Sequence, residues 1–395
     1  MQDQKPGSLI GGMLLIAGSC IGAGMLGLPI LTGLAGFFPS LFMFVAAWIF
    51  MTLTGLLLVE ANGWFSHQVN IVTLAGHALG RVGRVLSWTL YLFLFYALLV
   101  SYISGSGNLV STFIQGIPAW AGSLFFTALF GSIVYFGTRP VDLWNRLLMI
   151  GKIGAYFGLV FLGLKMITPE LLLHARPSYV FFSLPILVIS FGYHNMIPTL
   201  TAYMKGDLKR VRFTIIGGGL LALIIYVVWE VLVLGIVPLE GSHGILDSLH
   251  KDQEASQALA YILGSSWVSV LAQTLAFFAI LTSFLAQSLG LVHFLADGLN
   301  VTRAKKESVF LCLLTLGPPL AVALIYPKLF FKALNFAGGI CAVILFGVMP
   351  AVMVWIGRYR NQTLSSYRVK GGRSLLVGIL LTSALIFFSQ IASML

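Results

Sequence analysis

Two stretches of the chain combine glycine, proline and small polar residues within otherwise apolar sequence. The first is 18–29 and the second is 190–198. In a helix interior, glycine costs about 1 kcal/mol and proline about 3 kcal/mol relative to alanine, so both stretches predict interrupted helices. An interruption frees backbone N–H and C=O groups, which can bind the carboxylate and the ammonium of a zwitterion. The candidate substrate-binding residues lie at these two points: Ile21, Gly22, Ala23, Gly24, Ser190, Phe191, Gly192, Tyr193 and His194.

Ionisable side chains inside apolar runs form a second group of candidates. His194 stands at the second interruption, where the rings of Phe191 and Tyr193 could stack on an aromatic substrate. The alternative is a neutral histidine that is hydrogen-bonded to a freed carbonyl. Lys152 lies well inside an apolar run. It either extends to the membrane surface or is a buried ammonium that gains and loses a proton during transport.

Hydroxyl groups in a later run offer partners for that ammonium. Thr282 and Ser283 could face Lys152 or a sodium ion, or else bond to the carbonyl of the preceding turn. We therefore predict Lys152, Thr282 and Ser283 as an ion-coupling group. Glu60 is near enough to the end of its run to reach lipid headgroups, and the sequence identifies no partner for Glu230.

Three tyrosines share one long apolar run and could line a cavity or pack within the protein: Tyr91, Tyr96 and Tyr102. The three cysteines lie in apolar runs without paired spacing, so neither disulfides nor a metal site are expected. No nucleotide-binding loop or catalytic triad is present in the sequence. We expect neither a cofactor nor enzymatic activity.

The composition indicates what must position these residues. Charged residues make up 9% of the chain and hydrophobic residues 58%, whereas soluble domains carry roughly 25% charged residues. Apolar runs of about 20 residues, the length of a membrane-spanning helix, recur throughout, so we predict one all-α integral-membrane domain over 1–395. The eleven predicted spans are 8–34, 40–62, 87–114, 120–137, 144–167, 179–203, 211–237, 266–293, 307–326, 329–356 and 374–394.

The two interruptions open corresponding halves of the chain. Gly22 and Gly192 lie five predicted spans apart, which is typical of transporters built from inverted repeats with a binding site at the repeat interface. We predict a first repeat over 8–167, an inverted repeat over 179–356 and an additional helix over 374–394.

Basic residues set the predicted orientation. Most of the 23 Lys and Arg residues fall in one alternating set of connectors, which places the N-terminus in the cytoplasm and the C-terminus in the periplasm. This distribution explains the net charge of +11 by topology, so no nucleic-acid partner is expected. The longest outer connector, about 238–265, could carry a short surface helix.

Several motifs resemble those of the bacterial aromatic amino acid permeases, over essentially the whole chain. They are 21–25, 102–107, 190–194 and 367–373. The resemblance implies a fold similar to the sodium-coupled leucine transporter, with uptake driven by proton symport. It also implies that Lys152 occupies the space of a sodium ion, beside Thr282 and Ser283.

The sequence thus predicts a secondary active transporter in the bacterial inner membrane that imports L-tyrosine or another aromatic amino acid with a proton. Alternatives of the same fold are a tryptophan or a serine/threonine permease, or sodium coupling. A passive channel is disfavoured, because the few charges in the spans form no ring.

Overall fold

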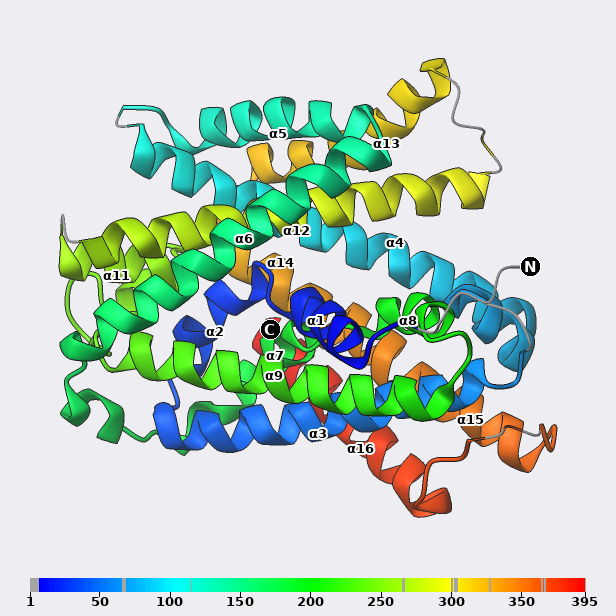
Figure 1. Ribbon diagram of the computed structural model, residues 1–395. Coiled ribbons are helices and arrows are strands. Elements are labelled where there is room, and N and C mark those ends of the chain that lie inside the picture. Colours follow the sequence, from blue (N-terminus) through cyan, green and yellow to red (C-terminus); the bar gives the residue numbers. More distant parts are fainter. Residues whose placement is uncertain are drawn as a thin grey trace.

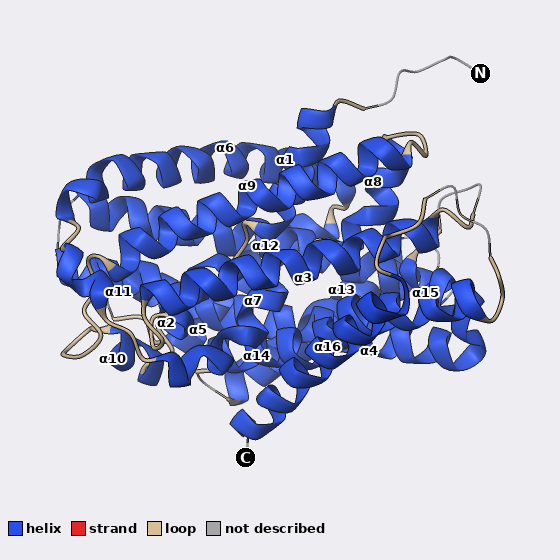
Figure 2. Ribbon diagram, turned by 90° about the horizontal axis from the view of Figure 1, so that it is seen from below, coloured by secondary structure: helices blue, strands red, loops and turns tan. Residues whose placement is uncertain are grey.

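The structure is a computed structural model that describes residues 7–65, 69–114, 116–264, 267–299, 301, 305–326, 328–363, 365 and 367–394. Within these ranges every regular element is a helix, and the long helices run side by side in one bundle (Figures 1 and 2). Nine are long and apolar enough to span a membrane, and a bent pair of shorter helices would add a tenth. The prediction of an all-helical multi-pass membrane protein is confirmed.

The helices of the first half are α1 (Leu9–Cys20), α2 (Gly24–Thr32), α3 (Phe37–Asn62), α4 (Ile71–Phe113), α5 (Ala119–Tyr135) and α6 (Thr138–Gly163). Those of the second half are α7 (Leu184–Ser190), α8 (Ile197–Tyr203), α9 (Leu208–Leu234), α10 (Ile245–His250), α11 (Ala255–Leu263), α12 (Trp267–Leu299), α13 (Lys305–Ile325), α14 (Phe330–Phe336), α15 (Met349–Tyr359) and α16 (Gly372–Met394).

The first predicted interruption lies between α1 and α2, which meet at an angle of 59°. The break is confined to residues 21–23. It does not extend to Pro29, which lies inside α2. Proline has no N–H, so the carbonyl four residues before it, that of Met25, lacks its helical donor. The indole N–H of Trp229 in α9 donates to this carbonyl over 3.0 Å. The buried tryptophan thus compensates for the proline and lets α2 continue.

The second interruption separates α7 from α8. Residues 191–193 are non-helical, and a short 3₁₀ segment, His194–Met196, leads into α8. Pro198 lies in the first turn of α8, where its missing N–H leaves no helical bond unmade. Both breaks lie deep in the bundle, where α2 packs against α7.

Three features differ from the predicted elements. Helix α4 begins at Ile71 rather than at residue 87, because a kink at Gly80, with φ of 68°, joins a polar first part to the apolar span. Residues 337–348 between α14 and α15 form a π-helical stretch. In that stretch Gly338 comes so close to the carbonyl of Pro185 that a Cβ would overlap it. The connector after α9 carries two helices rather than one, and α11 is largely buried.

Glu60 does not reach the headgroups, contrary to the prediction. Its carboxylate accepts bonds from Arg358 at 2.7 and 2.5 Å and from the amide of Val369 at 2.7 Å. Only 3% of each charged side chain is exposed. This pair joins α3 to α15 near the end of the bundle where the first described residue, Gly7, bonds to Tyr203. We call this end the N-side.

Candidate functional site

A central cavity of about 460 Å³ lies between the two breaks. From the first break it is lined by Ile21, Gly22 and Gly24, and from the second by Ser190 and Gly192. Helices α6 and α12 contribute the three predicted ion-coupling residues, Lys152, Thr282 and Ser283. Most of the predicted residues are therefore brought together around one space.

The first break is fixed to α12 through Ser283. The amide of Ala23 donates to Oγ of Ser283 over 3.0 Å. A Cβ on Gly22 would lie only 2.6 Å from the same oxygen, so a side chain at this position would displace it. Helix α2 has no side-chain cap, but the second and third amides of its first turn already donate to the carbonyls of Gly22 and Ala23 over 3.1 Å. The first amide of α2, that of Gly24, makes no bond to another described residue, and the small residues around it leave a ligand close access.

Tyr226 of α9 connects the two breaks. Its hydroxyl lies 2.6 Å from the carbonyl oxygen of Cys20 and 2.7 Å from that of Ser190. A phenol has one proton, so the two carbonyls at the ends of α1 and α7 share a single donor. Sequence reasoning missed this residue, because Tyr226 lies in an apolar run with no break and no neighbouring polar motif.

Lys152 is turned inward rather than toward the membrane surface. Its side chain is buried, and Nζ donates to the carbonyl of Ile21 over 2.7 Å and to Oγ1 of Thr282 over 3.4 Å. The Thr282 hydroxyl itself donates to the carbonyl of Phe278 in the preceding turn, over 2.8 Å. Its lone pair is thus directed to the ammonium. A positive charge lies directly against the first break.

Four predicted site residues lie outside the cavity lining. These are Ala23, Phe191, Tyr193 and His194. The hydroxyl of Tyr193 donates to the carbonyl of Met51 in α3, over 2.9 Å. Phe191 packs edge-to-face on Tyr226, with ring centroids 5.1 Å apart. Both rings fill the space between α7 and its neighbours.

His194 is fully buried between two rings. Its imidazole stacks on Phe346 with centroids 4.7 Å apart and on Tyr193 at 4.9 Å. Nε2 lies 2.9 Å from Oγ1 of Thr54 in α3. The histidine is thus bonded to a hydroxyl of a neighbouring helix rather than to a freed carbonyl. Through Phe346, which does line the cavity, it touches the site indirectly.

Amide side chains supply polar groups that the sequence reasoning did not assign to the site. Asn145, Asn195 and Gln287 line the cavity. Oδ1 of Asn145 and Oδ1 of Asn195 are buried without a partner among the described residues. The apolar wall includes Leu98, Tyr102 and Phe346. A ligand with one ring and several polar atoms matches this mixture.

Glu230 has a partner close to the end of α2. The hydroxyl of Thr32 donates to its carboxylate, and Oε2 has no partner within the described part of the chain. Together with Trp229, the preceding residue, it attaches α2 to α9 below the break. These two contacts position the half-helix that presents Gly24 to the cavity.

The end of the bundle opposite the N-side is closed by Asp252, in the connector between α10 and α11. Its carboxylate accepts from the amides of Phe330 and Phe331 over 2.7 and 3.1 Å, capping α14. Burial raises the pKa of this carboxyl to about 6, against the lowering effect of the two amides and of Lys332 and Lys328. The carboxylate thus joins this connector to the helix that continues into the π-helical stretch.

Similarity to known proteins extends over both breaks and all the helices that line the cavity. The model of the tryptophan/tyrosine permease family matches residues 5–390. The chain belongs to the tryptophan/tyrosine permease family. Tyrosine-specific transport system 1 of Haemophilus influenzae is 33% identical, over 95% of both chains.

Tryptophan carriers in this family are nearly as similar. The tryptophan-specific transport protein of Pseudomonas aeruginosa is 32% identical over 95% of this chain and 92% of its own. That of Haemophilus influenzae is 29% identical over the whole of this chain and 98% of its own. These relatives are transport proteins, which confirms the expectation of a permease rather than an enzyme.

Proposed function

We propose that this permease imports tyrosine together with a proton through the central cavity, by alternating access. The observation that carries the proposal is the meeting of two half-helix breaks around a cavity that also receives the buried ammonium of Lys152. A channel would need no such binding site.

The substrate zwitterion would bind at the breaks. The first amide of α2, that of Gly24, suits the carboxylate. The unpaired Oγ of Ser190 and Oδ1 of Asn195 are acceptors for the ammonium. The ring then extends toward Phe346 and Tyr102. The amide of Gln287 on α12, which also lines the cavity, would offer a hydrogen bond to a phenol.

Tyrosine is preferred over the alternatives because the cavity combines an aromatic wall with polar amides, and because tyrosine carriers are among the relatives. Tryptophan remains the second candidate, since its carriers are as close as 32% identical. Its indole N–H could bond to the same amide oxygens. A serine or threonine substrate would leave the aromatic wall unused.

Coupling is assigned to Lys152. The ammonium satisfies the carbonyl of Ile21, so loss of its proton weakens the contact that holds the first break against α6. A sodium ion in this position would be repelled by the charge, whereas a proton only changes the state of a group already present. This reasoning favours proton over sodium coupling.

Alternating access is supported by the difference between the two ends. Asp252 closes one end, while a second cavity leads from the central one to exposed residues on the N-side, among them Arg84 and Asp297. We infer that the structure represents a state open to the N-side. The basic connectors place that side in the cytoplasm, with the C-terminus in the periplasm of a bacterial inner membrane.

The packing supports the repeat assignment. We propose that 8–167 and 179–356 are inverted repeats, with α16 as the additional helix. The first break packs on α9, and the second break packs on α3 in the corresponding way. Likewise, α6 packs on α12, and its counterpart, the helix over 330–359, packs on α4. Helix α5 has 17 residues, which is about the lower limit for a span. Added to the nine long helices and the bent pair α1 and α2, it gives the proposed eleven spans.

Reconstituted vesicles test the proposal. Labelled tyrosine should accumulate inside when an inward proton gradient is imposed, and not when only a sodium gradient is present. Lys152→Ala should lose proton-driven accumulation, whereas Lys165→Ala, which removes an exposed lysine beyond the same helix, should retain it. Sodium-driven accumulation, or full proton-driven uptake by Lys152→Ala, would refute the coupling. Equilibration without accumulation would indicate a channel.

A further inference from the structure

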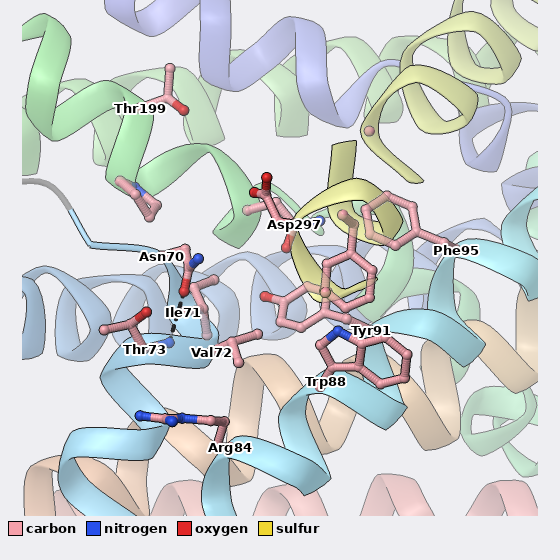
Figure 3. Close-up of a pocket in the computed structure, with 15 residues that line it drawn as sticks. Asn70, Ile71, Val72, Thr73, Arg84, Trp88, Tyr91, Phe95, Thr199 and Asp297 are labelled. Carbon is pink, nitrogen blue, oxygen red and sulfur yellow. Dashed lines mark hydrogen bonds between the residues drawn. The ribbon is translucent and has the colours of Figure 1, made fainter. Parts of the chain in front are cut away.

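A second cavity of about 420 Å³ adjoins the central one on the N-side. The two share Phe95, Asn195 and Gly290 in their linings, so the second cavity lies directly on the path between the site and the surface. Figure 3 shows that Trp88, Tyr91 and Phe95 come from one helix, α4, and lie together on one side of it. Its walls are richer in rings than those of the central cavity.

The rings form a packed cluster rather than an accidental lining. The indole of Trp88 stacks on Phe294 of α12, with centroids 5.4 Å apart and planes at 23°. A Cβ on Gly298 would lie 2.5 Å from Nε1 of Trp88, so a glycine is needed for the indole to take this position. Tyr91 packs against the same Phe294 at 6.2 Å. The cluster thus presents a preformed aromatic surface.

Tyr91 gives this surface an unused polar group. Its side chain is 5% exposed, and its hydroxyl is buried without a hydrogen-bond partner in the described part of the chain. Figure 3 shows the hydroxyl directed away from the α4 backbone toward the cavity. By contrast, the hydroxyl of Tyr96 on the same helix donates to the carbonyl of Leu314 over 2.8 Å. A buried unpaired hydroxyl is unfavourable, and a ligand in the cavity would supply the missing partner.

Charges of opposite sign stand at the rim. Arg84 of α4 and Asp297 of α12 both line the cavity and are exposed. Neither forms an ion pair with another described residue. A guanidinium suits a carboxylate, and a carboxylate suits an ammonium. The rim therefore complements the two charged groups of a free amino acid, as the cluster complements its ring.

We propose that this cavity is a second binding site for an aromatic amino acid, occupied between the central site and the cytoplasm. The inference rests on the proposed function, because it assigns to the cavity the same substrate. Its ring would lie on the Trp88 cluster, with Tyr91 bonding to a polar atom of the ligand and the rim residues binding the charged groups. Substrate would leave by passing from one site to the next.

Binding stoichiometry tests the inference. Purified protein in nanodiscs is titrated with radiolabelled tyrosine, and bound label is counted per protein. The wild type should bind two equivalents. Arg84→Gln, which changes an exposed side chain, and Trp88→Leu should each bind one equivalent with the affinity of the central site. Tyr96→Phe is the matched control and should bind two.

Transport from each side gives a second measurement. In vesicles, Arg84→Gln should raise by severalfold the half-saturating concentration of tyrosine applied to the proposed cytoplasmic side, and should leave that on the other side unchanged. One equivalent in the wild type, or two in both variants, would overturn the second site while the proposed function stands. A wild type that binds no tyrosine would overturn both.

Discussion

The substitution Gly22→Ala offers a sharp test of how the first break is held. The new Cβ would lie 2.6 Å from Oγ of Ser283 and 3.8 Å from its Cβ. Only the oxygen is too close. A serine hydroxyl can turn aside about a single torsion angle, but in doing so it leaves the amide of Ala23, to which it is bonded at 3.0 Å. The clash is therefore converted into the loss of one hydrogen bond.

The expected loss of stability follows from that hydrogen bond. A buried donor left without a partner costs about 1–3 kcal/mol, and replacing glycine by alanine at an accessible φ returns about 0.4–1 kcal/mol through the unfolded chain. Ser283→Ala removes the same bond directly. In the double variant the two Cβ atoms are at ordinary contact distance, and the bond can be lost only once. The double variant should therefore be no less stable than Ser283→Ala alone.

The assay is the free energy of unfolding of the four purified proteins in one detergent, followed by tryptophan fluorescence. Gly154→Ala is the control, because a Cβ there meets nothing within 4 Å. We expect a favourable interaction energy of about 1–3 kcal/mol between the two substitutions, equal to one shared bond. Additive losses would refute the idea that Gly22 and Ser283 compete for one position. Tyrosine uptake should fall in all three variants, because each loosens the break.

Three further predictions concern contacts across the bundle. Arg358→Leu leaves Glu60 buried and unpaired and should lower the free energy of unfolding by about 3–5 kcal/mol, whereas Leu at the exposed Arg360 should change it little; equal effects would contradict a buried pair. Tyr226→Phe should lower the free energy of unfolding by about 1–3 kcal/mol in the same assay, because the hydroxyl has one proton and can donate only one hydrogen bond at a time. A loss twice as large would show that both carbonyls depend on it independently. Because the folded pKa of Asp252 is raised to about 6 from 3.8, its contribution favours the fold at low pH and is lost as pH rises through about 6. Melting temperatures of wild type and Asp252→Asn measured from pH 4 to 8 should therefore diverge with pH, and parallel curves would exclude this titration.

The sequence predicted local features of the backbone well. The glycines around Gly22 and Gly192 break their helices, because glycine and proline act on the residues beside them. The inward position of Lys152 was one of two readings that the sequence left open, and the structure distinguishes them through Ile21 and Thr282. Pro29 shows the limit even of local rules. Its helix continues because a distant indole, that of Trp229, accounts for the missing bond.

The sequence could not predict which side chains within a break line the cavity. Ser190 and Gly192 line the cavity, while their neighbours Phe191 and Tyr193 point into the protein. In a regular helix the period of 3.6 residues assigns each side chain to a face, but a non-helical segment has no such period. An intramembrane histidine in this setting, such as His194, can therefore be a packed and bonded core residue although its ionisable group suggests a binding role.

Under the alternating access proposed above, the contacts at the two ends of the bundle restrict which movements can open the site. Opening the end opposite the N-side would require the amides of Phe330 and Phe331 to leave Asp252, and so would move the helix that continues into Phe346. Phe346 packs on Tyr91 with centroids 6.4 Å apart, and Tyr91 belongs to the second cavity. Release of the cap and rearrangement of the aromatic cluster are thus connected through one ring contact.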